Sequence, residues 1–328
     1  MEPAVQMRHV RKTFGKKVAV EGIDLDVPSG ELVGFIGPNG AGKSTTIRMI
    51  MSILFPDSGT LSVLGKKSAV ESKDRIGYLP EERGVYKKMK VGAFLKYMGS
   101  LKGLGGADLT RTADDWLERV QLGDVRKKKC EELSKGMQQK VQFIGCVLHE
   151  PDLIILDEPF SGLDPVNMRL IRDLIREQHD AGRTVIFSTH VMVQAEQLCD
   201  HIVMIHNGRK VIDDPIGAIR SRHAPRVVRF EGLNGADPSA AVGGLPEIER
   251  VSTTDGQFEA HLADGVDPGR AIASMTAAAP MARVELHRPS LEDIFIDIVQ
   301  DSTADAEARA RLRAKLRAGA AAEEGAES

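Results

Sequence analysis

A glycine-rich loop at residues 37–45, with the sequence Gly-Pro-Asn-Gly-Ala-Gly-Lys-Ser-Thr, is the feature that most constrains the fold of this chain. An apolar segment, Leu32–Ile36, precedes the loop, and a segment whose apolar residues have helical spacing follows it. In such an arrangement the glycines let successive backbone N–H groups curl around phosphates, and the helix N-terminus adds its positive dipole. The loop therefore predicts an α/β fold that binds a nucleoside triphosphate.

Each residue type in the loop suits a site for phosphate and magnesium. Lys43 is expected to reach the β- and γ-phosphates, and the hydroxyl of Ser44 is expected to bind Mg²⁺. A glycine-rich turn with an accidental lysine is the alternative, but the apolar residues behind the loop fall at i, i+3, i+4 and i+7. They are Ile47, Ile50, Met51 and Leu54. The predicted phosphate contacts are Gly37, Pro38, Asn39, Gly40, Ala41, Gly42, Lys43, Ser44 and Thr45.

Charge and aromatic content argue against a nucleic-acid partner. The 328 residues carry a net charge of −3, so the chain has no general basic field. With 1 Trp and 3 Tyr, few side chains are available to stack on bases. We therefore expect no nucleic acid among the partners.

Cysteine spacing and hydropathy predict the compartment. The three cysteines are far apart, which predicts neither a disulfide framework nor a zinc site and favours a reducing compartment. The sequence shows no signal peptide and no apolar run of about 18 residues. We expect a cytoplasmic protein that serves a membrane process only by docking on separate membrane subunits, at the inner face of the cell membrane.

Periodicity divides the chain into two domains and a tail. Apolar and polar residues alternate at the N-terminus, which predicts an antiparallel sheet with one exposed face. Helical segments between residues 91 and 149 predict a helical insert, after which apolar strands return at Leu153–Leu156 and Thr184–Ser188. We expect a first domain with a mixed sheet over residues 1–219, a small α+β module of βαββαβ-like order over 220–300, and a tail without fixed structure over 301–328.

Turn signals locate the connections. Asn207-Gly208 predicts a two-residue hairpin, and Asp255-Gly256 predicts another in the C-terminal module. Residues 213–226 are expected to form a linker between the domains. The module carries no chemical motif, so a regulatory or dimerising role and a passive appendage both stay open. For the tail, a solvated charge run and a contact with anionic lipid stay open.

Two carboxylates follow the apolar strand at Leu153–Leu156. Asp157 is expected to hold Mg²⁺ together with Ser44, and Glu158 to polarise the water that attacks the γ-phosphate. An exposed acidic loop is the alternative, but such a loop seldom follows four buried aliphatic residues. The pair therefore predicts hydrolysis as well as binding.

A serine begins a predicted helix in the segment Leu133-Ser134-Lys135-Gly136-Met137-Gln138-Gln139, and by itself it predicts only an N-cap. Together with the loop at 37–45, the Asp157-Glu158 pair, Ser161-Gly162-Leu163-Asp164 and His190, in this chain order, it resembles the motif set of the ATP-binding cassette (ABC) family. The resemblance covers residues 1–219. It implies a P-loop ABC ATPase domain with an N-terminal antiparallel subdomain and a helical insert, acting on ATP with Mg²⁺.

The resemblance also implies roles for single residues. Ser134, Lys135 and Gly136 would bind the γ-phosphate of ATP held by the opposite subunit, so that two subunits close head-to-tail over two nucleotides. The physical chemistry agrees, because a serine, a backbone amide and a helix N-terminus form a receptor for an anion. His190 would contact the γ-phosphate as a catalytic residue. The loop that crosses between subunits would consist of Ser161, Gly162, Leu163 and Asp164.

Three positions need separate treatment. Phe14 lies where the family has an aromatic that stacks on adenine, with a core phenylalanine as the competing interpretation. Glu81, after Ile76-Gly77-Tyr78-Leu79-Pro80, stands where family members usually carry a glutamine that contacts metal and water. Its carboxylate could still ligate Mg²⁺ and take part in catalysis, but it adds negative charge beside a polyphosphate. Lys135 replaces the glycine of many signatures, and its positive charge suits a phosphate neighbour.

The resemblance implies the ATPase subunit of a transporter that powers separate transmembrane permease subunits, as a homodimer or paired with a second ABC ATPase subunit. The chain resembles bacterial exporter ATPases of the sodium-extrusion and drug-resistance type, which favours export. A soluble ABC ATPase in translation or DNA repair is the alternative, although such proteins usually carry two cassettes, a coiled-coil insert or zinc cysteines. A non-enzymatic nucleotide-binding regulator would lack Glu158 or His190, but both are present. A GTPase is disfavoured, because the sequence has no Asn-Lys-x-Asp element for reading guanine.

Overall fold

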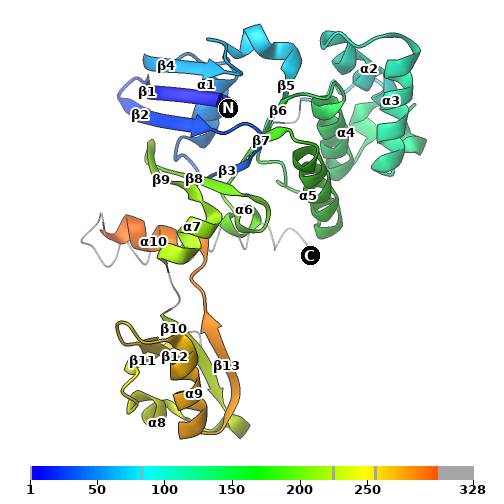
Figure 1. The fold of residues 1–328 in the computed structure, drawn as a ribbon. Coiled ribbons are helices and arrows are strands. Elements are labelled where there is room, and N and C mark those ends of the chain that lie inside the picture. The colour runs from blue at the N-terminus through cyan, green and yellow to red at the C-terminus, as the bar shows by residue number, and fades with distance from the viewer. Residues whose placement is uncertain (1, 83, 224–225, 255–256, 302–328) are drawn as a thin grey trace. The chain divides into compact units, whose positions relative to one another are not determined.

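Three β-sheets organise the part of the chain that the computed structural model describes, which is residues 2–82, 84–223, 226–254 and 257–301. The chain divides into two units, the first running to Ile216 and the second beginning at Gly217 (Figure 1). The turn predicted at Asp255-Gly256 and residues 302–328 of the predicted tail lie outside the described residues.

A six-stranded sheet forms the centre of the first unit, with the strand order β5-β6-β7-β3-β8-β9. The first five of these strands are parallel, and β9 pairs antiparallel with β8, so the sheet is mixed, as predicted. Strands β3, β6 and β7 are buried along their whole length, which explains their nearly continuous apolar sequences. The bounds are β3 (Leu32–Ile36), β5 (Ile76–Leu79), β6 (Leu153–Asp157), β7 (Thr184–Thr189), β8 (His201–His206) and β9 (Arg209–Pro215).

The N-terminal antiparallel sheet predicted from the alternating residues is present and has the order β2-β1-β4. β1 (Val5–Phe14) and β2 (Lys17–Val27) bury alternate residues, which fits a sheet with one exposed face. The third strand, β4 (Ser58–Val63), was not predicted. It has few apolar residues, and four of its six residues are small or hydroxylated, so it carries little of a strand signal.

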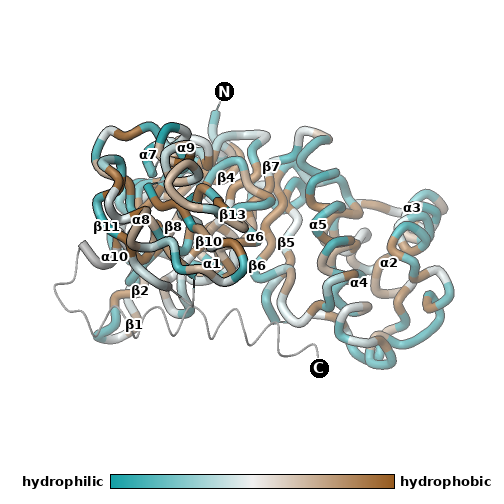
Figure 2. Tube along the Cα trace, turned by 90° about the horizontal axis from the view of Figure 1, so that it is seen from below, coloured by the Kyte–Doolittle hydropathy of each residue, from teal (hydrophilic) through white to brown (hydrophobic). Residues whose placement is uncertain are grey.

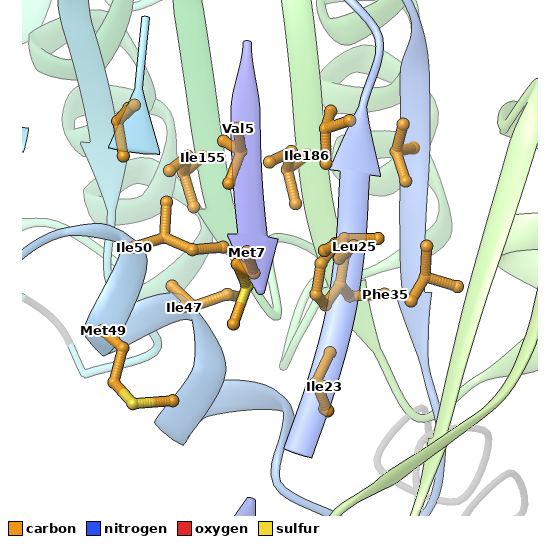
Figure 3. Close-up of a cluster of buried hydrophobic side chains, with 14 of the residues drawn as sticks. Val5, Met7, Ile23, Leu25, Phe35, Ile47, Met49, Ile50, Ile155 and Ile186 are labelled. Carbon is orange, nitrogen blue, oxygen red and sulfur yellow. The ribbon is translucent and has the colours of Figure 1, made fainter. Parts of the chain in front are cut away.

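One hydrophobic core joins these two sheets through α1 (Lys43–Ile50). Figure 3 shows the side chains of Ile47 and Ile50 grouped with Val5 and Met7 of β1, in the same buried cluster as Ile155 and Ile186 of the central sheet. Both isoleucines of α1 are fully buried, and burying a side chain of this size stabilises a fold by about 1.5–3 kcal/mol. This packing fixes the start of α1 and therefore the loop before it.

The predicted helical insert is also present. Its helices are α2 (Val91–Leu101), α3 (Gly106–Arg119) and α4 (Lys135–Val147). Two short 3₁₀ helices, η2 (Gly123–Val125) and η3 (Cys130–Glu132), lie between α3 and α4. A further 3₁₀ helix, η1 (Ala69–Arg75), precedes β5. Two further helices, α5 (Pro165–Asp180) and α6 (Met192–Leu198), follow strands β6 and β7. In Figure 2, brown hydrophobic residues gather along central strands such as β6 and β7, whereas teal residues cover much of α3 and α5.

The second unit has the predicted βαββαβ order of strands and helices, formed by β10, α8, β11, β12, α9 and β13. Its sheet has the order β11-β12-β10-β13, and its core combines one face of that sheet with residues of α8 and α9. The predicted linker at 213–226 is wrong in part, because β9 runs to Pro215 and helix α7 follows it. The bounds are α7 (Ile216–Arg222), β10 (Val227–Gly232), η4 (Leu233–Gly235), α8 (Ser239–Gly243), β11 (Ile248–Thr254), β12 (Gln257–Leu262), α9 (Pro268–Ala278), β13 (Met281–His287) and α10 (Leu291–Asp301). Of the helices that the structure describes, none has the length and apolar character needed to span a bilayer.

The close approach of β5 and α4 yields a stability prediction. A Cβ atom at Gly77 of β5 would lie 2.3 Å from the carbonyl oxygen of Cys146 in α4, so Gly77→Ala should destabilise the first unit by about 1–3 kcal/mol. Urea unfolding followed by the fluorescence of Trp116, the 1 tryptophan of the chain, measures this.

Gly145→Ala provides the control for this prediction. Gly145 is also buried, but a Cβ there would meet only side-chain atoms at 3.4 Å or more, and alanine favours a helix over glycine by about 1 kcal/mol. Equal destabilisation by the two substitutions would contradict the prediction.

Candidate functional site

Four parallel strands of the central sheet end at one edge, and the predicted site residues follow them. The register pairs Ile36 of β3 with Thr189 of β7, and Asp157 of β6 with Ser188 of β7. Because the carboxyl ends of parallel strands share an edge, the segments after them meet there. These segments are the loop at 37–45 after β3, His190 after β7, Glu158 after β6 and Glu81 after β5.

Backbone packing explains two glycines of the loop. Gly37 and Gly42 have φ values of 146° and 114°, which residues with side chains rarely adopt. A Cβ at Gly37 would lie 2.1 Å from the carbonyl oxygen of Ile205, and one at Gly42 would lie 2.5 Å from that of Ala19. The loop is therefore pressed against β8 and β2, and its shape needs glycine at both positions.

Lys43 is held inside the loop. Its ammonium donates a hydrogen bond to the carbonyl oxygen of Gly37 at 2.7 Å and lies 3.8 Å from a carboxylate oxygen of Glu158. The side chain is buried, and this burial lowers the pKa of Lys43, while Glu158, Asp157 and Glu81 raise it by their negative charge. A buried cation beside these carboxylates is placed for a phosphate chain.

A cleft of about 370 Å³ opens over the loop. Phe14 borders the cleft and is 49% exposed, so it is not a core residue, and an aromatic face is available there for a ring such as adenine. The remaining lining residues are Lys17, Ala19, Asn39, Gly40, Ala41, Gly42, Lys43, Ser44, Thr45, Glu81 and Glu158.

Asp157 and Ser44 form a donor set that suits Mg²⁺. The hydroxyl of Ser44 lies 3.3 Å from Oδ1 of Asp157, and Ser188 also donates a hydrogen bond to Oδ1. Burial, followed by the nearby charge of Glu158, raises the pKa of Asp157, and the two serine hydrogen bonds oppose this rise. A divalent cation would favour the ionised form, and hydroxyl and carboxylate oxygens are the ligands that Mg²⁺ prefers.

Glu158 has an unusual backbone conformation. Its φ of 50° lies in the left-handed region, which costs a residue with a side chain about 1–3 kcal/mol. Its N–H donates to Oγ of Ser188 at 3.1 Å, and its Oε1 lies 3.1 Å from Nδ1 of His190. When Glu158 is ionised its carboxylate only accepts hydrogen bonds, so Nδ1 of His190 is then the donor in this contact. The strained turn directs the carboxylate into the cleft, between Lys43 and His190.

Glu81 lines the same cleft from the end of β5. Partial burial raises the pKa of Glu81, and the negative charges of Asp157 and Glu158 add to this effect. Glu81, which stands where the resemblance leads us to expect glutamine, is therefore at a position where a negative charge is unfavourable.

The segment of Ser134, Lys135 and Gly136 is not among the residues that line the cleft of the same chain, as far as the structure describes it. Ser134 caps α4, its Oγ accepting from the N–H of Met137 at 3.3 Å, and both Ser134 and Lys135 are exposed. A Cβ at Gly136 would lie 3.7 Å from the side chain of Leu163, so this segment borders the predicted crossing loop.

The crossing loop itself is short and ordered by its own hydrogen bonds. Ser161 donates its N–H to the carbonyl oxygen of Glu158 at 3.2 Å, which ties the predicted crossing loop to the backbone of Glu158. Gly162 takes a φ of 67°, and Asp164 caps α5 by accepting from the N–H of Asn167 at 2.9 Å. Ser161, Gly162 and Asp164 are exposed, whereas Leu163 is buried.

Sequence reasoning missed Ser188. Its hydroxyl donates to Asp157 and accepts from the N–H of Glu158, so it links the two predicted acidic residues. The sequence signal was its place at the end of a buried strand, directly across from Asp157 in the register. A buried polar residue there needs partners, which the neighbouring strand supplies.

Comparison with known proteins gives the family. Residues 20–161 match the family model described as ABC transporter, and residues 215–299 match the C-terminal domain of ATP-binding proteins like DrrA1-3. An uncharacterised ABC transporter ATP-binding protein, YhaQ of Bacillus subtilis, is 39% identical over 291 residues, which are 89% of this chain and 97% of YhaQ.

Named relatives and a solved structure agree. The ABC transporter ATP-binding protein NatA of Bacillus subtilis is 37% identical over 70% of this chain and 94% of NatA. The linearmycin resistance ATP-binding protein LnrL of the same organism is 30% identical over 90% of this chain and 97% of LnrL. A solved ATP-binding subunit of an ABC transporter aligns with a TM-score of 0.62 and 31% identity, over 67% of this chain and 92% of that one.

Ser188 leads to a prediction about metal use. Ser188→Ala removes the hydrogen bonds that hold Asp157 and Glu158, so Mg²⁺-dependent ATP hydrolysis should fall about 10–100-fold, with a higher Mg²⁺ requirement. Phosphate release as a function of Mg²⁺ concentration measures both effects. Thr184→Ala removes a hydroxyl from the other end of β7, where it accepts from Gly30, and should leave the Mg²⁺ dependence unchanged. Wild-type kinetics for Ser188→Ala would contradict the prediction.

Proposed function

The chain belongs to the ATP-binding subunits of ABC transporters and is an ATPase of that family, and on this basis we propose that two subunits close head-to-tail over two ATP molecules to power export. The membrane path is supplied by separate permease subunits. The partner in the closed pair is a second copy of this chain or a second ABC ATPase subunit, and the complex works at the inner face of the cell membrane.

One observation carries the proposal of a divided site. The cleft contains the phosphate loop, Lys43 and Glu158, while Ser134 caps an exposed helix N-terminus that does not line this cleft in the described structure. A helix N-terminus with an exposed serine favours an anion, and the crossing loop lies beside it. Both features are explained if a second subunit brings its ATP to Ser134.

The residues of the cleft divide the chemistry between them. Lys43 and the loop N–H groups bind the β- and γ-phosphates, and Phe14 stacks on the base. Ser44 and Asp157 would hold Mg²⁺, with Glu81 as a further candidate ligand, and the ion would neutralise charge on the phosphates. Glu158 accepts the proton of the attacking water, and His190, held by Glu158, contacts the γ-phosphate.

The relatives support export. LnrL is named for linearmycin resistance, and further relatives are named Nod factor export ATP-binding protein I, such as that of Cupriavidus metallidurans, which is 36% identical over 216 residues. ATP binding closes the pair because it adds contacts that only the closed state makes, and cleavage removes them.

The divided site predicts complementation between two inactive variants. Lys43→Ala disables the loop half of a site, and Ser134→Arg disables the opposite half. A mixture of the two should recover about a quarter of the wild-type ATPase rate, because roughly half of randomly mixed dimers combine both variants and keep one intact site. Phosphate release from the mixture at a fixed total concentration measures the recovery.

A second mixture serves as the control. Lys43→Ala combined with Glu158→Gln should stay inactive, since both substitutions affect the same half of the site and every mixed site keeps one defect. A rate per molecule that does not change over a wide dilution series, together with no recovery in the first mixture, would rule out the divided site.

Glu81→Gln yields a separate prediction. Because the negative charge of Glu81 is disfavoured beside Asp157 and Glu158, the neutral amide should retain the ATPase rate or raise it by about two- to fivefold. The steady-state ATPase rate measures this, with Glu82→Gln, an exposed neighbour, as the control. A loss of about tenfold or more at Glu81 alone would mean that this chain needs its carboxylate as a metal ligand or base.

A further inference from the structure

Two lysine-rich segments of the helical insert lie side by side. The N–H of Val91 donates to the carbonyl oxygen of Lys128 at 3.0 Å, and the N–H of Cys130 donates to that of Met89 at 2.9 Å. Lys90 and Lys129 form an antiparallel bridge. Two segments that are far apart in the sequence thereby lie side by side, and their basic residues, called here the basic strip, are Lys87, Lys88, Lys90, Arg126, Lys127, Lys128 and Lys129.

Among the residues that the structure describes, two of the seven basic residues of the strip are paired with carboxylates, and five are not. Arg126 pairs with Asp114 at 2.8 Å, and Nζ of Lys129 lies 3.4 Å from Glu131. The other five side chains are exposed and form no ion pair with any residue in the described parts of the chain. Like charges on adjacent segments repel one another, so the strip is suited to an anionic partner, although the whole chain carries a net charge of −3.

Two tyrosines border the strip. Tyr86 directly precedes Lys87 and is 52% exposed, and Tyr97 in α2 is 38% exposed. Their rings meet edge-to-face with centroids 5.5 Å apart. Tyrosine has an apolar ring and a polar hydroxyl, which suits the boundary between headgroups and hydrocarbon in a bilayer.

The composition of the strip favours a diffuse anionic surface over a single acidic group. Planar recognition of one carboxylate or phosphate favours arginine, but the single arginine of the strip is already paired with Asp114. Lysine acts as a flexible point charge and needs no fixed geometry from its partner. Clusters of four to eight basic residues next to a membrane are typical of binding to anionic lipids.

We propose that the basic strip binds the anionic headgroups of a lipid bilayer and so docks the helical insert on the membrane surface. The inference rests on the proposed function only for the expectation that the subunit works beside a membrane. The binding itself requires neither ATP nor a permease.

Co-sedimentation of the full chain with vesicles tests the proposal. The chain should bind phosphatidylcholine vesicles that contain about one third phosphatidylglycerol, and not vesicles of phosphatidylcholine alone. Binding should weaken as salt rises from about 0.1 M to about 1 M, since the screening length falls from roughly 10 to 3 Å.

Two double charge reversals isolate the strip. Lys127→Glu with Lys128→Glu should lower the partition coefficient on anionic vesicles about tenfold or more, and Lys87→Glu with Lys88→Glu should do the same. Lys66→Glu with Lys67→Glu changes the net charge equally at an exposed turn after β4 and should leave binding unchanged. None of these residues lines the cleft, so the ATPase rate in solution reports that the variants are folded.

Three results would overturn the proposal. The first is that the wild-type chain does not bind anionic vesicles. The second is that the strip variants and the control variant lose binding to anionic vesicles equally. The third is that binding depends on the strip only with phosphatidylcholine vesicles that contain a permease subunit. The last result would assign the strip to an acidic protein surface. All three leave the mixing experiment on the divided site untouched, so failure of this inference and failure of the proposed function are distinguishable.

Discussion

Parallel pairing of β5, β6, β7 and β3 is the constraint on which the nucleotide site depends. These strands are almost fully buried on both faces, so a slip of one residue in register would exchange the side chains that pack against the two faces and disrupt both sets of contacts. The same register sets Asp157 beside Ser188 and brings the segments after the strands to one edge. Residues separated by more than a hundred positions, such as Ser44 and Asp157, meet for this reason, while α1 is fixed to the same core by Ile47 and Ile50.

The electrostatics of the cleft favour the joint binding of ATP and Mg²⁺ that we propose. Asp157, Glu158 and Glu81 lie near a buried Lys43, and the pKa values of Asp157 and Glu81 are raised while that of Lys43 is lowered. Burial therefore disfavours charge of either sign in this cleft. A polyphosphate alone would add to the negative charge, whereas its magnesium complex offsets both the phosphates and the carboxylates.

Much of this arrangement could be predicted from the sequence, because buried parallel strands and phosphate loops have strong local patterns. The buried strands at Leu32–Ile36, Leu153–Leu156 and Thr184–Ser188, the helical insert, the hairpin at Asn207-Gly208 and the α+β module follow from periodicity and turn chemistry. β4 and α7 were missed, since their sequences are weakly apolar and tertiary contacts decide their structure. Ser188 was missed for a different reason. Its role arises from the strand beside it, and a single serine at a strand end carries no signal of that neighbour.

The basic strip and the proposed receptor for the partner's ATP are joined by a short, well-bonded segment. Lys129 is followed by η3 and then by Ser134, and the side-chain amide of Gln138 donates to the carbonyl oxygens of Cys130 and Leu133 at 3.1 and 3.0 Å. No flexible linker separates the two surfaces in this stretch of the described chain. An insert held on the bilayer by the strip would therefore hold Ser134 at a fixed height above the membrane. When the pair closes over ATP, the Ser134 segment of one subunit would then stay in place on the membrane. The phosphate loop of the other subunit would move toward it.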